Sequence, residues 1–120
     1  MIAKQVFKVF FWLFLVALLY LSLSPIPAVT PNIQNSDKIV HAAAYGLLFA
    51  LAVKSYNARL PLWALAAATM AFGVSMEWAQ SYTGYRYAEP LDMVANGTGI
   101  GIMWLLVMLS RRLRVQRRAQ

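Results

Sequence analysis

Three short stretches of an otherwise apolar chain carry ionisable or amide side chains at helical spacing. Within each stretch these side chains stand three or four residues apart, which places them along one face of a helix. The sets are Asp37, His41 and Tyr45; Glu77 and Gln80; and Asp92 and Asn96. A histidine close to carboxylates can exchange protons with a substrate, so the sets could form a chemical site if three helices bring them together.

The candidate catalytic residues are His41, Glu77 and Asp92. His41 would act as a general base oriented by Asp37, with Glu77 or Asp92 as an acid or a metal ligand. One histidine with carboxylates could hold a divalent metal, but no spacing here is diagnostic, so we assign no metal ligand and expect no cofactor. The chain has no cysteine, and no serine stands in a nucleophile motif, so covalent catalysis has little support.

The composition indicates a membrane protein with a single domain, residues 1–120. Of the 120 residues, 61% are hydrophobic, and this share is well above that of a soluble domain. Only 12% are charged. A soluble protein of this size could not bury so much apolar surface, whereas a bilayer can cover it. The net charge of +7 does not indicate nucleic-acid binding, because five of the eleven Lys and Arg residues lie in the last ten positions, directly after an apolar segment.

Four apolar runs predict an all-α protein with four transmembrane helices, because about 20 apolar residues cross a bilayer. The first run has the basic start of a signal peptide, but its length and the lack of a clear cleavage site favour a retained helix. The predicted spans are about 6–23, 39–55, 62–80 and 91–109, followed by a basic tail, 110–120.

The basic residues predict the orientation of these spans. Four crossings place nine of them on one side and only Lys38 and Arg86 on the other, so both termini should be cytoplasmic. All four carboxylates and His41 then lie at the outer ends of helices or in the outer loops, about 24–36 and 81–90. The nine are Lys4, Lys8, Lys54, Arg59, Arg111, Arg112, Arg114, Arg117 and Arg118.

Part of the outer polar set has a simple structural explanation. Asp37 and Asp92 could complement helix N-termini, and Lys38 and Arg86 could reach lipid headgroups. Capping does not explain the polar residues inside the helices, which are usually paired or functional in a membrane. We therefore predict a shared site at the outer face. Its candidate ligand-binding residues are Asp37, Lys38, His41, Tyr45, Glu77, Gln80, Arg86, Asp92 and Asn96.

The glycines of "NGTGIG" predict close helix packing. They lie inside an apolar helix and follow no strand, so they do not form a phosphate-binding loop. Gly97 and Gly101 stand four residues apart, and such a pair of small residues lets a neighbouring helix approach closely. We expect these two glycines to form the contact face.

The polar pattern as a whole resembles the VanZ-like family of small bacterial membrane proteins. The matching order is Asp37-Lys38-x-x-His41-x-x-x-Tyr45, then Glu77-x-x-Gln80, then Arg86, then Asp92-x-x-x-Asn96-x-x-Gly99. The resemblance covers about residues 36–102, and Ala42 stands where family members often carry an aromatic residue. It implies a four-helix protein of the bacterial cytoplasmic (inner) membrane whose polar residues gather at one face. It also implies a link to the cell envelope or to glycopeptide antibiotics, since the family is named for a member associated with teicoplanin resistance.

Our first functional hypothesis is that the outer face binds an amphiphilic envelope ligand, such as a lipid headgroup, a lipid-linked precursor or a glycopeptide-like molecule. Arg86 and Lys38 would contact a phosphate or carboxylate, and the carboxylates and amides would contact sugar or amine groups. Membrane lipids are the expected partners, and nucleic acid is not. The alternatives are an intramembrane enzyme acting on such a lipid and a purely structural or accessory protein. Proton-coupled transport is less favoured, because no acid or histidine lies near the membrane midplane.

Overall fold

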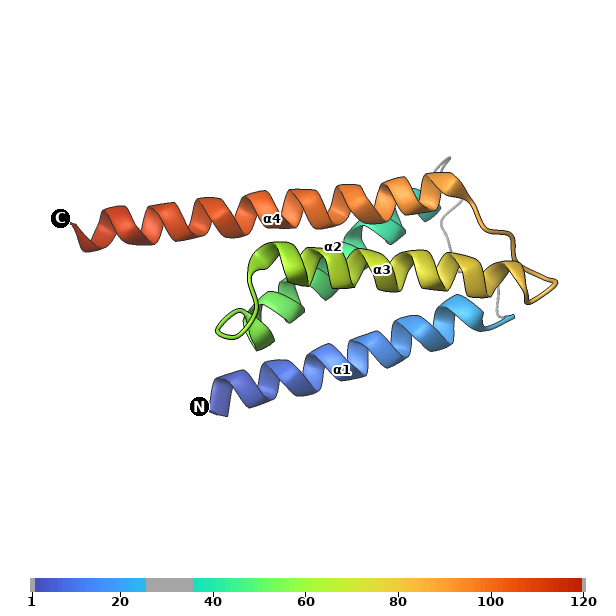
Figure 1. The fold of residues 1–120 in the computed structure, drawn as a ribbon, viewed down its shortest axis with the longest axis horizontal. Helices are drawn as coiled ribbons and strands as arrows, with labels where there is room; N and C mark the ends of the chain where they lie inside the picture. The colour runs from blue at the N-terminus through green and yellow to red at the C-terminus, as the bar shows by residue number, and fades with distance from the viewer. Residues whose placement is uncertain (1, 26–35, 120) are drawn as a thin grey trace.

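The computed structural model describes residues 2–25 and 36–119, and it is all-helical within them, as predicted (Figure 1). Each of its four helices is long and apolar enough to cross a membrane, which indicates a multi-pass membrane protein. Residues 26–35 of the expected first outer loop lie outside the described residues. The helices are α1 (Ile2–Leu23), α2 (Ser36–Tyr56), α3 (Leu62–Ser81) and α4 (Pro90–Arg118).

Prolines mark the starts of two helices. Pro61 immediately precedes α3 and Pro90 is the first residue of α4, where the missing backbone N–H leaves no helical hydrogen bond unmade. The helices extend beyond the predicted apolar runs. In particular, α4 continues through the basic tail to Arg118. Arginine has a high helix propensity, and the side chains of this segment are exposed, so the tail can remain helical without packing against the bundle.

The start of α1 and the end of α4 lie at the same end of the bundle (Figure 1). At this basic end the Arg111 guanidinium donates a hydrogen bond of 2.7 Å to the side-chain oxygen of Asn57, which joins α4 to the turn after α2. Trp12 of α1 donates a hydrogen bond of 2.9 Å to the hydroxyl of Tyr56 at the end of α2. The opposite end, called the polar end here, contains the start of α2, the end of α3 and the start of α4.

Helix α2 supplies most of the core and contacts the other three helices. Helix α1 contains no buried residue and packs against the core through one face only. Many large apolar side chains on the outside of the bundle are exposed, as expected of helices surrounded by lipid. The core residues are Tyr45, Leu48, Phe49, Ala52, Val53, Leu62, Leu65, Ala66 and Ile100.

The closest approach of α2 and α4 depends on Gly99 and not on the predicted pair of glycines. A Cβ atom added to Gly99 would lie 1.9 Å from the carbonyl oxygen of Ala42, and one added to Gly46 would lie 3.1 Å from the carbonyl oxygen of Gly99. A Cβ atom added to Gly97 would meet only the flexible Met70 side chain, at 3.8 Å, and one added to Gly101 would have no described residue of another element within 4 Å. The prediction for Gly97 and Gly101 was wrong. Helix α4 is rotated about its axis so that Gly99, two positions away from each of them, faces α2.

Candidate functional site

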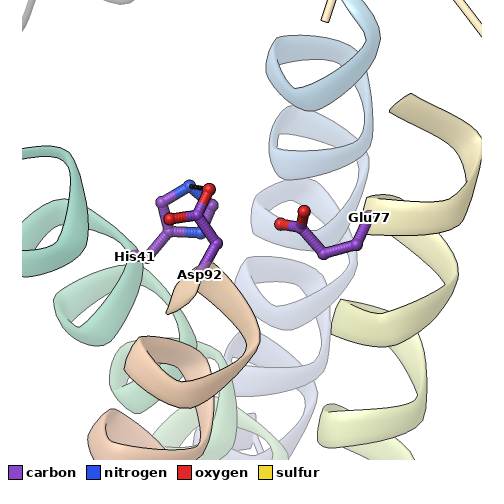
Figure 2. Close-up of side chains that lie close together, drawn as sticks. All are labelled: His41, Glu77 and Asp92. Carbon is purple, nitrogen blue, oxygen red and sulfur yellow. Dashed lines mark ion pairs between the residues drawn. The ribbon is translucent and has the colours of Figure 1, made fainter. Parts of the chain in front are cut away.

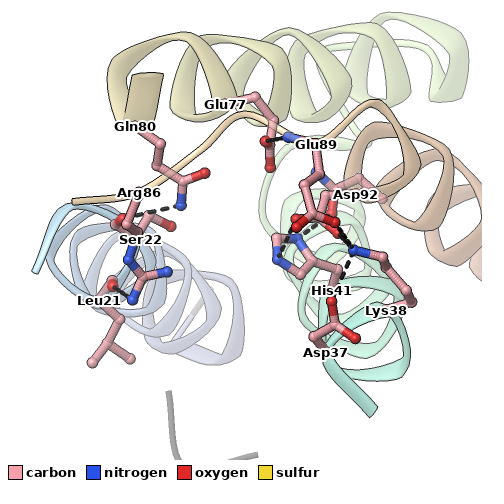
Figure 3. A network of polar contacts seen from close by, with 11 residues as sticks. Leu21, Ser22, Asp37, Lys38, His41, Glu77, Gln80, Arg86, Glu89 and Asp92 are labelled. Atoms are coloured by element: carbon pink, nitrogen blue, oxygen red, sulfur yellow. Dashed lines mark hydrogen bonds and ion pairs between the residues drawn. The ribbon is translucent and has the colours of Figure 1, made fainter. Parts of the chain in front are cut away.

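Lys38 is the centre of a charged cluster at the polar end (Figure 3). Its ammonium group forms ion pairs with Asp37 at 2.8 Å, with Glu89 at 2.5 Å and with Asp92. Helix α2 contributes the lysine and Asp37, whereas Asp92 comes from the first turn of α4 and Glu89 from the residue before it. The cluster thus joins the starts of α2 and α4, where negative side chains also complement the helix dipoles.

His41 lies one turn further along α2 and faces α4. Its Nδ1 atom is 3.1 Å from Asn96 Oδ1, and its Nε2 atom is 3.5 Å from Asp92 Oδ2. We expected Asp37 to orient His41, but Asp37 pairs with Lys38, and the imidazole contacts Asn96 and Asp92. Since an amide oxygen can only accept, the contact with Asn96 places the hydrogen on Nδ1. The Nε2 atom then faces a carboxylate.

Glu77 approaches the same place from α3. Figure 2 shows its carboxylate directed toward His41 and Asp92. The side chain is buried, with 1% of its surface exposed, and its Oε2 atom accepts a hydrogen bond of 3.2 Å from the backbone N–H of Glu89. Among the described residues Glu77 forms no ion pair. One ligand atom from each of His41, Glu77 and Asp92 lies within 4.8 Å of the other two, so three helices meet at this point.

Gln80 and Arg86 lie at the same end but contact α1. The side-chain nitrogen of Gln80 donates to the carbonyl oxygen of Ser22 at 3.0 Å, and the Arg86 guanidinium donates to that of Leu21 at 3.4 Å (Figure 3). The last carbonyl groups of a helix have no hydrogen-bond donor within that helix, and these two side chains supply donors to α1. The positive charge of Arg86 also interacts favourably with the negative end of the α1 dipole. Both residues therefore have a structural role in holding α1 to the rest of the bundle.

Tyr45, the innermost predicted site residue of α2, belongs to the core below the cluster. Its side chain is buried and its ring centroid lies 6.3 Å from that of Phe72. A Cβ atom on Gly73 would lie 2.9 Å from the Tyr45 ring and 3.1 Å from Asn96 Nδ2. That Nδ2 atom is buried and donates no hydrogen bond to any residue that the structure describes. The Tyr45 ring and the Asn96 amide group therefore both lie close to the backbone of Gly73.

Glu89 is the functional candidate that sequence reasoning missed. Its carboxylate pairs with Lys38, and its backbone N–H donates to Glu77, so it connects α3 with the charged cluster. The sequence predicts that it is one of four carboxylates on the outer side. It is three residues from Asp92, but it precedes the first residue of α4, so this spacing did not place it on the face of a predicted helix. Its position directly before Pro90, where a helix N-terminus attracts acids, was the available signal.

The cluster has more negative than positive groups. Its four carboxylates, Asp37, Glu77, Glu89 and Asp92, share one ammonium group and one imidazole. Such an arrangement suits a ligand or ion that brings positive charge, because carboxylates close together repel one another, most strongly where they are buried. It suits a purely anionic group less well, since Lys38 is already surrounded by three carboxylates.

An apolar cavity of about 240 Å³ lies elsewhere in the bundle, between α1, α2 and α3. None of the described residues that line it is charged, and none belongs to the polar cluster. The residues that line it are Phe11, Leu15, Leu48, Ala52, Tyr56, Leu60, Leu65, Ala68, Thr69 and Phe72.

Comparisons of the chain with family models, with curated proteins and with solved structures gave no match. The functional assignment therefore depends on the geometry of the polar end itself.

Proposed function

We propose that the protein spans the bacterial cytoplasmic membrane four times and binds an amphiphilic envelope ligand at its polar end. The observation that carries this proposal is the cluster around Lys38, which brings four carboxylates together from α2, α3 and the start of α4. A structural ion pair would need only one acid for each base. The surplus of carboxylates favours a ligand whose polar part carries an amine.

The membrane orientation follows from charge. Arg111 and the other arginines of the last turns of α4 lie at the end opposite to the cluster, together with the start of α1 (Figure 1). Basic residues are retained on the cytoplasmic side, so the polar end faces the outer leaflet. There the cluster is at the depth of lipid headgroups. The resemblance to the VanZ-like family supports the same orientation and a ligand from the envelope, including a glycopeptide-like molecule.

A zwitterionic amphiphile fits this end best. Its ammonium group would lie against the exposed carboxylates of Asp37 and Glu89, whose side chains are about half exposed. Its phosphate would interact electrostatically with the Arg86 guanidinium, which lies beside the last turn of α1 at the polar end. The apolar outer faces of the helices would accommodate the acyl chains.

Photocrosslinking with two probes tests this proposal. Purified protein in lipid nanodiscs is irradiated with a photoactivatable phosphatidylethanolamine or with the matched phosphatidylglycerol, which lacks the amine. We expect preferential labelling by the phosphatidylethanolamine probe, and loss of the preference in a Asp37→Asn, Glu89→Gln double variant. Arg111→Gln, which removes an arginine at the opposite end, is the matched control. Equal labelling by both probes, or an unchanged preference in the double variant, would contradict the proposal.

A competition arm separates the possible sources of such a ligand. Teicoplanin, which also carries an amine on an amphiphilic scaffold, is added to the same reaction. Competition at stoichiometric concentration would extend the site to glycopeptide-like molecules, whereas undiminished labelling would restrict it to membrane lipids.

A second candidate, an enzyme acting on an envelope lipid, has one observation in its favour. The imidazole of His41 and the carboxylates of Glu77 and Asp92 lie within 4.8 Å of one another, close enough to exchange protons with one bound group. Incubation of the protein with total lipid extract tests this candidate. Conversion of a lipid that His41→Gln abolishes would establish an enzyme, and an unchanged extract would remove the candidate.

A further inference from the structure

We propose that His41, Glu77 and Asp92 hold a divalent transition-metal ion at the junction of α2, α3 and α4. One nitrogen and two carboxylate oxygens from these residues lie within 4.8 Å of one another (Figure 2). On a tetrahedral ion with bonds of about 2.0–2.2 Å, ligand atoms are about 3.4 Å apart. Small side-chain rotations, with at most about 1.4 Å of closing, therefore bring the three onto one ion.

The orientation of His41 is the one that a metal ligand requires. Its Nδ1–H donates to Asn96 Oδ1 at 3.1 Å, and Asn96 is buried with only 1% of its surface exposed. Ligating histidines generally donate their second ring nitrogen to such a partner, which fixes the tautomer. The lone pair of Nε2 then faces Asp92 Oδ2 at 3.5 Å. Two electron-rich atoms facing each other need a cation or a proton between them.

Glu77 provides the second, independent observation. Its side chain is 1% exposed and directed at the same point, yet its carboxylate receives a single backbone hydrogen bond and forms no ion pair within the described part of the chain. A buried carboxylate without a counter-charge is strongly disfavoured. An ion bound between Glu77, His41 and Asp92 would supply that charge.

The neighbouring group of carboxylates is already occupied. Asp37, Glu89 and Asp92 also bring three oxygens within 4.8 Å of one another, but the Lys38 ammonium pairs with all three. Asp92 turns Oδ1 toward Lys38 and Oδ2 toward His41. The lysine therefore neutralises one side of Asp92, and the proposed ion neutralises the other.

The donor set indicates the class of metal. An imidazole nitrogen with two carboxylates suits Zn²⁺, Co²⁺ and similar first-row ions, whereas Mg²⁺ and Ca²⁺ prefer oxygen ligands alone. Three protein ligands also leave a coordination position open, which is the usual arrangement where a metal contacts another molecule.

Titration of the chelator-treated protein in detergent with Co²⁺ and Zn²⁺ tests the proposal, with calorimetry and the visible absorption of bound Co²⁺ as readouts. We expect about one ion per chain and a loss of at least about 100-fold in affinity in His41→Gln and in Glu77→Gln. Asp37→Asn removes one carboxylate charge from the same cluster, as Glu77→Gln does, but it removes no metal ligand. We therefore expect it to change the metal affinity by no more than about threefold.

Thermal unfolding of the metal-free variants keeps the result interpretable, because a variant that unfolds like the wild type has lost only the ligand. Absence of saturable binding to the wild type would overturn the proposal and would indicate a protonated His41 paired with Asp92. Equal losses in Asp37→Asn and Glu77→Gln would also overturn it, because general charge attraction would then explain the binding. The titration contains no lipid probe, so its failure and the failure of the proposed ligand-binding function are separate results.

Discussion

His41 Nδ1 and Asn96 Oδ1 lie 3.1 Å apart, across the closest interface of the bundle. The two residues are 55 positions apart in sequence and belong to α2 and α4. Asn96 is buried, and its amide group and the Tyr45 ring both lie beside Gly73 of α3. Asn96 contacts one ring nitrogen of His41, and Asp92 faces the other. The orientation of the only histidine thus depends on the packing of three helices.

Asn96 should act as a positioning residue for the metal site. Asn96→Leu removes the acceptor of the His41 Nδ1–H, and loss of such a partner typically costs 10–100-fold in metal affinity, so we expect about that decrease. Asn96→Asp retains an oxygen acceptor and should keep the affinity closer to that of the wild type. The two affinities are compared by Co²⁺ titration. Equal affinities in the two variants would show that the contact does not orient the histidine.

Gly99→Ala should destabilise the bundle strongly. The new methyl group would lie 1.9 Å from the Ala42 carbonyl oxygen, which is backbone and cannot rotate away, so α2 and α4 must separate. Such overpacking typically costs about 1–3 kcal/mol. Gly101→Ala is the matched control, because no described residue of another element lies within 4 Å of its Cβ position. Thermal unfolding in detergent measures both, and similar melting temperatures for the two variants would contradict the observed packing.

Lys38→Met should leave three carboxylates without their shared counter-charge. We expect a loss of about 1 kcal/mol in the free energy of unfolding, since the lysine is partly buried but two of its partners, Asp37 and Glu89, are about half exposed. Lys54→Met, at the opposite end, removes only the contact with the Phe7 ring and should cost less. Chemical unfolding in mild detergent compares the two. A Lys38→Met variant as stable as Lys54→Met would show that the cluster does not need the lysine.

Cysteine labelling tests the proposed orientation, and the natural lack of cysteine provides a clean background. Tyr87→Cys lies in the loop between α3 and α4, where Tyr87 is 86% exposed, and Gln116→Cys lies in the exposed last turns of α4. A membrane-impermeant maleimide should label Tyr87→Cys in intact cells and Gln116→Cys only after permeabilisation. The reverse pattern would place the polar end in the cytoplasm.

The helices could be predicted from the sequence because their signals are local. Runs of apolar residues, and prolines such as Pro61 and Pro90, locate all four helices to within a few residues at most boundaries. The exception is the end of α4, which continues nine residues past the apolar run to Arg118. Hydropathy reports the part of a helix that fits a bilayer, but it does not report where the backbone stops being helical.

The site could be predicted only in part. Helical spacing predicted a shared face for Asp92 and Asn96, and both contact His41. It also grouped Glu77 with Gln80, but Gln80 contacts α1. The structure brings His41, Glu77 and Asp92 within 4.8 Å of one another. Spacing within a helix does not determine how far each helix is rotated about its axis. For this reason Gly99 rather than Gly101 forms the contact with α2, and Asp92 rather than Asp37 faces His41. The role of Glu89 follows from a loop conformation, which no periodic pattern encodes.

The position of a lipid crosslink on the chain shows whether the ligand binds at the polar end. After irradiation with the phosphatidylethanolamine probe, whose photoreactive group is attached near the amine, the modified residues are identified by mass spectrometry. We expect modification to concentrate around the cluster, in the first turns of α2 and α4 and in the loop before Pro90. Modification distributed evenly along the exposed faces of the helices, or concentrated near Asn57 and Arg111 at the basic end, would contradict it.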